Sequence, residues 1–98
     1  MPPSLPKGIR FEEGKGKHKY TAILPNGKRI SFGHVDYEHY KDSVPIELGG
    51  GLWSYKNHGD KSRRSNYRSR HGALKCKDGI LCINKKYTPA WFSFYFLW

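Results

Sequence analysis

The most regular pattern of apolar and polar positions lies in residues 18–33, HKYTAILPNGKRISFG. Apolar and polar residues alternate there in two short runs. The apolar members are Tyr20, Ala22 and Leu24 in the first run and Ile30 and Phe32 in the second. Alternation with a period of two is typical of a strand with one buried face. Because Asn26-Gly27 favours a tight turn between the runs, the pattern predicts an N-terminal β-hairpin that ends at Gly33.

The next segment has a weaker pattern. In residues 34–43, Val35, Tyr37 and Tyr40 form a sparse apolar stripe that fits either a helical turn or a loop. Residues 44–56 contain three consecutive glycines, which allow a hinge or the close approach of another backbone. We therefore expect a glycine-rich insertion near 44–56, between two ordered parts of the domain.

The stretch DKSRRSNYRSRHGA, residues 60–73, combines dense positive charge with helix signals. Asp60 is a suitable N-cap, and Gly72 is a suitable residue to close a helix that runs to about His71. The sequence therefore predicts a basic helix in the middle of the chain.

Residues three and four apart share one face of such a helix, so Arg64, Arg68 and His71 form a stripe. Tyr67 is the large apolar side chain of the segment, and we expect it to anchor the helix to the core. A helix with one ring inward and many cations outward is not held by its own burial. It requires the rest of the domain or a partner.

Cys76 and Cys82 bracket a second tight-turn pair, Asp78-Gly79, which predicts a short second hairpin. We expect Ile80, Leu81 and Ile83 near the core. The cysteine spacing does not match a common zinc module, even if nearby histidines are added. Two partly buried free thiols are the favoured state, and a disulfide across the hairpin is the alternative.

The C-terminal segment is predicted to be an aromatic helix that begins with Thr88 as its cap and Pro89 at its first position. Its rings surround a single polar residue, Ser93. The rings are those of Trp91, Phe92, Phe94, Tyr95, Phe96 and Trp98. A domain of this size hardly buries all six, so part of the segment is expected to touch something outside the chain. The alternative is a terminal helix that completes the core.

Residues 1–17 contain Pro2, Pro3 and Pro6 together with several glycines and lysines. Proline forbids regular hydrogen bonding, so this stretch is predicted to be a flexible Pro/Gly-rich basic arm that becomes ordered on a partner. Residues 18–98 then form a single small α+β domain, with an N-terminal hairpin, a basic helix, a short second hairpin and an aromatic C-terminal helix.

Charge is the strongest indication of function. The 98 residues include 18 Lys and Arg against 8 Asp and Glu, which gives a formal net charge of +10. A solvated basic surface is one explanation. The size of the excess favours an anionic partner, and the candidates are nucleic acid, a lipid head group and an acidic protein surface. No secretory signal and no apolar run near the ~20 residues of a membrane span is visible, so we expect synthesis in a reducing compartment and no transmembrane segment.

Candidate catalytic chemistry is weak. His34, Asp36 and Glu38 would share a face of an extended segment and could bind a divalent ion, but an exposed polar turn is favoured. The serines do not lie in a nucleophile elbow, and residues 49–51 lack the Lys-Ser/Thr of a phosphate-binding loop. The prediction is a non-enzymatic protein with no cofactor, no metal and no small-molecule substrate.

The predicted partner-binding surface combines cations with rings. Its members are Lys61, Arg63, Arg64, Arg68 and Arg70 on the basic helix and Trp91, Phe94, Tyr95 and Trp98 on the terminal helix. The planar guanidinium binds carboxylates in a bidentate manner, and interfaces favour Arg together with Trp and Tyr. Binding to phosphates with stacking on bases is the alternative, and it would be mainly electrostatic.

The order of three motifs adds a resemblance. The motifs are LPNGKRISFGHVDYEHY, HGDKSRRSNYRSRHGA and YTPAWFSFYFLW. Over about residues 19–98 the chain resembles a family of small, basic, uncharacterised proteins of nucleocytoplasmic large DNA viruses, with members in chlorella viruses and mimivirus-like viruses. The proline-rich arm and the VPIELGGGLW stretch depart from that family.

The resemblance implies a viral origin, with synthesis in the host cell cytoplasm. Small basic viral proteins without catalytic residues are often virion components. We therefore expect a minor capsid protein, located in the virion, that binds the major capsid protein and other capsid proteins through acidic surfaces. The alternative is a sequence-independent nucleic-acid-binding protein involved in viral genome packaging.

Overall fold

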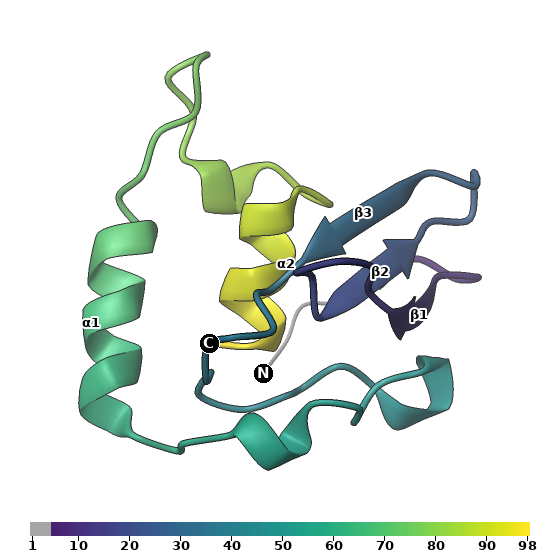
Figure 1. Cartoon of the computed structure of the whole chain (residues 1–98). Helices are drawn as coiled ribbons and strands as arrows, with labels where there is room; N and C mark the ends of the chain where they lie inside the picture. Colours follow the sequence, from purple (N-terminus) through teal and green to yellow (C-terminus); the bar gives the residue numbers. More distant parts are fainter. Residues whose placement is uncertain (1–4) are drawn as a thin grey trace.

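The computed structural model describes residues 5–98, and these form an α+β domain (Figure 1). A three-stranded antiparallel sheet has the order β1-β2-β3. Helix α2 lies between this sheet and helix α1 (Figure 1). The strands are β1 (Arg10–Glu13), β2 (Tyr20–Ile23) and β3 (Arg29–Phe32), and the α-helices are α1 (Lys61–His71) and α2 (Pro89–Phe96). Three short 3-10 helices lie in the connections: η1 (Ile46–Leu48), η2 (Ser54–Lys56) and η3 (Cys82–Asn84).

The predicted hairpin is confirmed as β2 and β3. Tyr20 pairs with Phe32 and Ile23 pairs with Arg29 across the two strands. The turn is closed by the Leu24 amide, which donates to the Lys28 carbonyl at 2.9 Å, and Gly27 has a φ of +87°. A positive φ is the conformation for which glycine is required in this turn.

The prediction of a flexible arm over residues 1–17 is wrong for residues 10–13. These form β1, one of the two edge strands, in which Phe11 pairs with Ala22 of β2. Phe11 and the preceding Ile9 are buried in the core. The short alternation of apolar and polar residues in this strand was missed because the surrounding residues are rich in Pro and Gly. Burial of Phe11 stabilises the strand. Residues 1–4 of the predicted arm lie outside the described residues.

The core is built from rings. Phe11 and Phe32 of the sheet pack against Phe92 and Phe96 of α2, and the Phe32 and Phe92 rings stack at 5.1 Å. Thr88 caps α2 by accepting from the Trp91 amide, and Pro89 occupies the first turn, as predicted. The rings of α2 therefore serve mainly to complete the core, which was the alternative interpretation of the aromatic segment.

Residues 33–60 form a long connection from β3 to α1, without regular structure beyond η1 and η2. The glycine-rich part lies close to the sheet. A Cβ on Gly49 would lie 2.0 Å from the carbonyl oxygen of Phe11, and Gly49 has a φ of +107°. The expected close approach of another backbone is confirmed here, because only a residue without a side chain fits.

A buried polar network fastens this connection to the sheet. The Asp42 carboxylate accepts from the Tyr20 hydroxyl at 2.5 Å and from the amides of Val44 and Trp53. On its other side, the Asp42 amide donates to the Asn57 side-chain oxygen at 2.7 Å. Each buried polar group of this network has a hydrogen-bond partner, so the free energy lost on desolvation is offset. The network therefore stabilises one position of the connection.

Lys19 and His39 extend this network, and each is only 1% exposed. The Lys19 ammonium donates to the Tyr37 carbonyl at 2.5 Å and to His39 Nδ1 at 2.7 Å, and His39 Nε2 contacts the Asn57 oxygen at 2.7 Å. This arrangement fits a neutral imidazole that accepts at Nδ1 and donates at Nε2. Burial, and then the charge of Lys19, lower the pKa of His39 to about 4. Burial also lowers the pKa of Lys19 to about 8.

The predicted second hairpin is wrong in detail. Between Cys76 and Cys82 the chain makes a turn with one isolated bridge, from Lys75 to Leu81, and no strand is assigned in this part of the described chain. Ile80, expected near the core, is 49% exposed. The segment around residues 76–82 protrudes from the body (Figure 1). Cys76 and Cys82 form a disulfide, so the prediction of free thiols is also wrong. The turn places their Cα atoms 5.2 Å apart, within the range that a disulfide bridges.

No helix in residues 5–98 combines the length and the apolar character that crossing a membrane requires.

Candidate functional site

The basic helix α1 forms where the sequence predicts it. The Asp60 carboxylate accepts from the amides of Ser62 and Arg63, at 2.9 and 3.2 Å, and caps the first turn. Basic residues occupy the last turn, where they interact favourably with the helix dipole. No residue of α1 is buried. The helix is therefore held by contacts other than an apolar face.

Two arginines of α1 lie over aromatic rings. The guanidinium of Arg64 lies 4.8 Å from the centre of the Tyr40 ring, and its Nε donates to the Trp98 carbonyl at 2.8 Å. The guanidinium of Arg68 lies 4.2 Å from the centre of the Phe94 ring. The predicted stripe of Arg64 and Arg68 thus contacts rings of the domain, while both side chains remain partly exposed. Cation–π contacts of this kind contribute roughly 0.5–2 kcal/mol each.

Tyr67 attaches the same face of α1 to the C-terminal end of the chain. Its ring stacks on Trp98, with centroids 4.2 Å apart and planes 6° apart, and on His71 at 3.9 Å. Burial raises the pKa of Tyr67 to about 12. The expectation that Tyr67 anchors the helix is confirmed, although the anchor is a stack of half-buried rings and not a ring inside the core.

One flank of α1 forms a shallow groove of about 380 Å³, which we call the α1 groove. Its lining residues are Lys61, Arg64, Ser65, Arg68 and Ser69. Burial, and then the charge of Arg64, lower the pKa of Arg68, so the two arginines repel each other. Among the described residues, no Asp or Glu side chain forms an ion pair with a cation of this groove. The groove therefore presents concentrated positive charge whose repulsion an anion would relieve.

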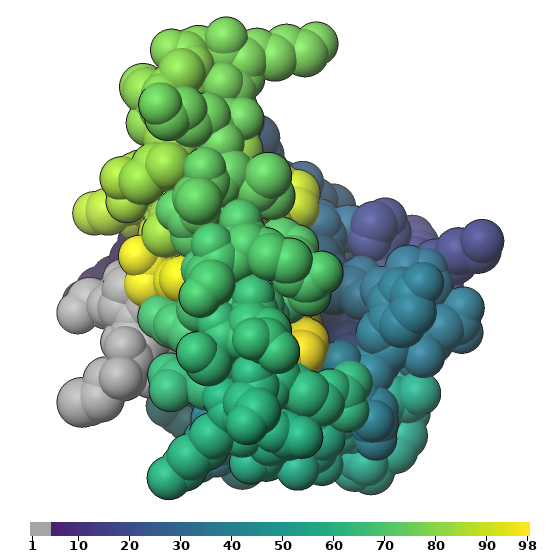
Figure 2. All heavy atoms as spheres, turned by 90° about the vertical axis from the view of Figure 1, so that its left-hand side faces the viewer, coloured from purple at the N-terminus to yellow at the C-terminus, as the bar shows by residue number. Residues whose placement is uncertain are grey.

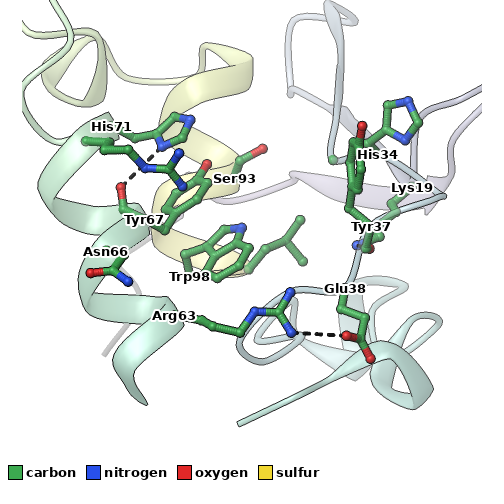
Figure 3. A pocket seen from close by; sticks show the side chains of 13 residues that line it. Lys19, His34, Tyr37, Glu38, Arg63, Asn66, Tyr67, His71, Ser93 and Trp98 are labelled. Atoms are coloured by element: carbon green, nitrogen blue, oxygen red, sulfur yellow. Dashed lines mark hydrogen bonds and ion pairs between the residues drawn. The ribbon is translucent and has the colours of Figure 1, made fainter. Parts of the chain in front are cut away.

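Figure 2 shows α1 crossing one face of the molecule, with atoms of the C-terminal segment visible on both sides of it. The second flank carries the other two predicted cations. Arg63 forms an ion pair with Glu38 at 3.1 Å, and Arg70 is exposed. Both line a larger cavity of about 700 Å³, which we call the α1–loop cavity, between α1 and the loop after β3 (Figure 3). The five predicted cations thus divide between two sites.

The aromatic part of the predicted partner surface needs correction. Trp91 is 3% exposed and Phe94 is 6% exposed, so in this conformation neither is available to a partner. Tyr95 and Trp98 are half-buried. The reason is that α2 packs between the sheet and α1, which covers two of its sides.

Exposed apolar side chains occur elsewhere, in the connection before α1. Ile46 is 78% exposed and Tyr55 is 75% exposed. Sequence reasoning missed Ile46, because an isolated apolar position near glycines carries no periodic signal. Tyr55, with Trp53 and Tyr67, was a candidate for stacking on bases in the nucleic-acid alternative.

The described residues contain no group of three or more His, Cys, Asp or Glu side chains that could hold a metal ion. His34 and Asp36 approach each other at 3.9 Å, while Glu38 is directed to Arg63. The alternative of a divalent-ion site in residues 34–39 is therefore not supported, and the disulfide removes Cys76 and Cys82 as zinc ligands.

Comparison of the chain with family models, curated proteins and solved structures gives no match.

Proposed function

We propose that this chain is a non-enzymatic structural component of a large DNA virus particle, a minor capsid protein that binds acidic surfaces of neighbouring capsid proteins, the major capsid protein among them. The observation that carries the proposal is the α1 groove, in which Lys61, Arg64 and Arg68 have no Asp or Glu partner among the described residues. The location in a particle is supported by the resemblance of the three motifs quoted above to a family of viral proteins.

The groove suits a carboxylate-bearing surface for a physical reason. The rings of Tyr40 and Phe94 hold the guanidinium groups of Arg64 and Arg68 in place. An anion that binds a pre-ordered guanidinium does not have to restrict a flexible side chain, so less conformational entropy is lost on binding. Ser65 and Ser69 add hydroxyl donors beside the cations. The distance from Lys61 to Arg68 along the helix axis is roughly 10 Å, enough for several carboxylates of one acidic segment.

The first experiment measures binding of the full chain to a labelled oligoglutamate peptide by fluorescence anisotropy over a salt series. Lys61→Glu is expected to weaken binding roughly tenfold, since it reverses a charge at the groove. Lys15→Glu is the matched control, because it changes the net charge equally at an exposed position away from α1. Equal loss of binding in the two variants would show that only the overall charge matters and would contradict the groove.

The second experiment concerns the particle. Quantitative mass spectrometry of purified virions is expected to detect the protein at a fixed ratio to the major capsid protein. Detection in infected cells but not in purified particles would contradict the structural role.

A second candidate function is sequence-independent binding to duplex nucleic acid in genome packaging. The observation that favours it is the alternation of cations with Ser65 and Ser69 in the α1 groove, because Arg, Lys and Ser are common donors to phosphates. Labelled duplex DNA in the same salt series tests it. Tighter binding to DNA than to oligoglutamate, with a steep salt dependence that Lys61→Glu reduces, would favour this function over the first.

A further inference from the structure

The α1–loop cavity is distinct from the α1 groove, because it lies on the opposite flank of the helix. Its walls come from three elements: α1, the loop that contains His34 and Tyr37, and the end of the chain with Ser93 of α2 and Trp98 (Figure 3). Its volume of about 700 Å³ is within the range of small-molecule sites. The cavity can therefore hold a ligand of the size of a nucleotide.

Aromatic side chains lie on both sides of this cavity. On the loop side, Tyr37 is 67% exposed, and its ring contacts His34 with centroids 4.7 Å apart. On the α1 side, Tyr67 and Trp98 are fixed by their mutual stacking. Figure 3 shows Tyr37 and His34 facing Tyr67 and Trp98 across the cavity. Two aromatic walls favour a planar ring between them.

The charged groups of the cavity favour an anion beside that ring. Arg70 has no carboxylate partner among residues 5–98, and Lys19 lies buried behind the Tyr37 backbone, where its ammonium contributes positive potential. Glu38 is the single acidic side chain in the lining, and Arg63 pairs with it at 3.1 Å. The cavity thus combines aromatic walls, a net positive potential and the polar side chains of Asn66 and Ser93.

We propose that the α1–loop cavity binds a nucleotide unit, either a free nucleotide or one residue of a single-stranded nucleic acid. The base stacks on the exposed ring of Tyr37, Asn66 and Ser93 bind polar groups on the edge of the base, and Arg70 binds the phosphate. Stacking on aromatic side chains together with phosphate contacts to cations is the general means of binding single strands.

Glu38 regulates access to a second cation in this scheme. The Glu38 carboxylate forms an ion pair with the Arg63 guanidinium, and this pair lies at one edge of the cavity (Figure 3). Both side chains of the pair are about half exposed, so the pair is easily separated. A bound phosphate then competes with Glu38 for the Arg63 guanidinium.

The test is a titration of the isotope-labelled full chain with adenosine 5′-monophosphate, adenosine and inorganic phosphate, followed by NMR. The monophosphate is expected to bind at least roughly fivefold more tightly than adenosine or phosphate alone, because it uses both the aromatic wall and the cation. The Trp98 indole and Asn66 amide signals should shift, while the indole signal of the buried Trp91 should not.

Variants locate the binding. Tyr37→Ala is expected to weaken nucleotide binding roughly fivefold or more, the usual effect of removing one stacking side chain. Glu38→Gln should tighten it roughly two- to fivefold by releasing Arg63. Glu47→Gln is the matched control, since it removes the same charge at an exposed position outside the cavity.

The outcomes separate this site from the proposed function. Lys61→Glu should leave nucleotide binding nearly unchanged, since Lys61 lines the α1 groove and not the cavity. An oligothymidylate that binds more tightly than the mononucleotide, with the same dependence on Tyr37, identifies a single strand as the ligand; equal affinity identifies a free nucleotide. The proposal is overturned if the monophosphate does not bind at millimolar concentration, or if Glu38→Gln and Glu47→Gln have equal effects on its binding. It is also overturned if oligoglutamate alone shifts the signals of the cavity residues without displacing the bound monophosphate.

Discussion

The two sides of α2 are held by different interactions. On the side of the sheet, Phe92 and Phe96 pack among buried rings of β1 and β3, away from water. On the side of α1, the guanidinium of Arg68 lies over Phe94 of α2, and a stack of half-buried rings joins Tyr67 to Trp98, just after α2. The guanidinium of Arg64 lies over Tyr40, in the connection before α1. The same short helix thus joins a core stabilised by burial to a basic helix that buries no residue of its own.

This difference predicts a difference in local stability. Burial of rings removes a large apolar area from water, whereas cation–π contacts and half-exposed stacks contribute little each. Regions with few buried contacts open at lower free energy than the core. We therefore expect α1 to open before the sheet, which leaves its charged flanks adaptable to a partner.

The largest effect is expected in the core. Phe32→Ala removes a ring that is almost fully buried and stacks on Phe92, and should lower the free energy of unfolding by about 3–5 kcal/mol. Denaturant unfolding followed by circular dichroism measures it. Tyr37→Ala, which truncates an exposed ring, is the control and should change the stability by less than about 0.5 kcal/mol. Similar losses in the two variants would contradict the assignment of the core.

The buried network that holds the connection to α1 is sensitive to pH. The pKa of His39 is about 4 in the folded chain against 6.5 for the ordinary group, so between these values the unfolded chain binds more protons. Stability should therefore fall as the pH decreases from 6.5 to 4, by on the order of 3 kcal/mol from this group.

His39→Gln isolates that contribution from the titration of the carboxylates, because glutamine does not titrate and retains a donor in place of Nε2. The difference between the unfolding free energies of the two proteins should be constant above about pH 7 and shrink toward acid. Parallel stability curves down to pH 4 would show that His39 is not buried as a neutral group.

Tyr67→Ala tests the attachment of α1 and should cost about 1–2 kcal/mol. Hydrogen exchange is the sharper measurement, because the amides of α1 should exchange faster while those of β2 are nearly unchanged. Tyr67→Phe keeps the stack on Trp98 and is the control. Equal acceleration of exchange in β2 would mean that α1 and the sheet form one cooperative unit.

The smallest effect on stability is expected from removing the Arg68 guanidinium that lies over the Phe94 ring. Arg68→Ala should lower stability by roughly 0.5–1 kcal/mol, since the contact is partly exposed. Arg70→Ala, on the exposed flank, should have no measurable effect on unfolding. If Arg70→Ala destabilised the chain as much as Arg68→Ala, the loss would reflect general charge effects and not the contact with the ring.

The sequence predicted elements well where the signal was local. The Asn26-Gly27 turn, the Asp60 cap and Thr88-Pro89 each set a boundary through a side chain or dihedral angle that neighbouring residues alone determine. Prediction was wrong for β1, because a strand at residues 10–13 depends on its pairing with β2. It was also wrong for Cys76 and Cys82, since the pairing of thiols depends on how close the turn brings them.

The candidate site was predicted in composition but not in arrangement. The charge density of α1 is visible in the sequence, yet helical spacing could not show that Arg64 and Arg68 face rings of the domain. Neither could it show that Arg63 and Arg70 share a cavity with Tyr37, a residue distant from both in the sequence.

The sequence by itself thus determined an α+β chain with a capped basic helix, an aromatic C-terminal helix and a large positive charge, because turns, caps and charge are properties of short segments. The tertiary structure decided which rings are buried and which cations interact with other groups of the same chain. It also decided which flanks of α1 remain accessible to a partner. These depend on contacts between segments far apart in the sequence, such as Arg64 with Tyr40 and Tyr67 with Trp98, which no local pattern encodes.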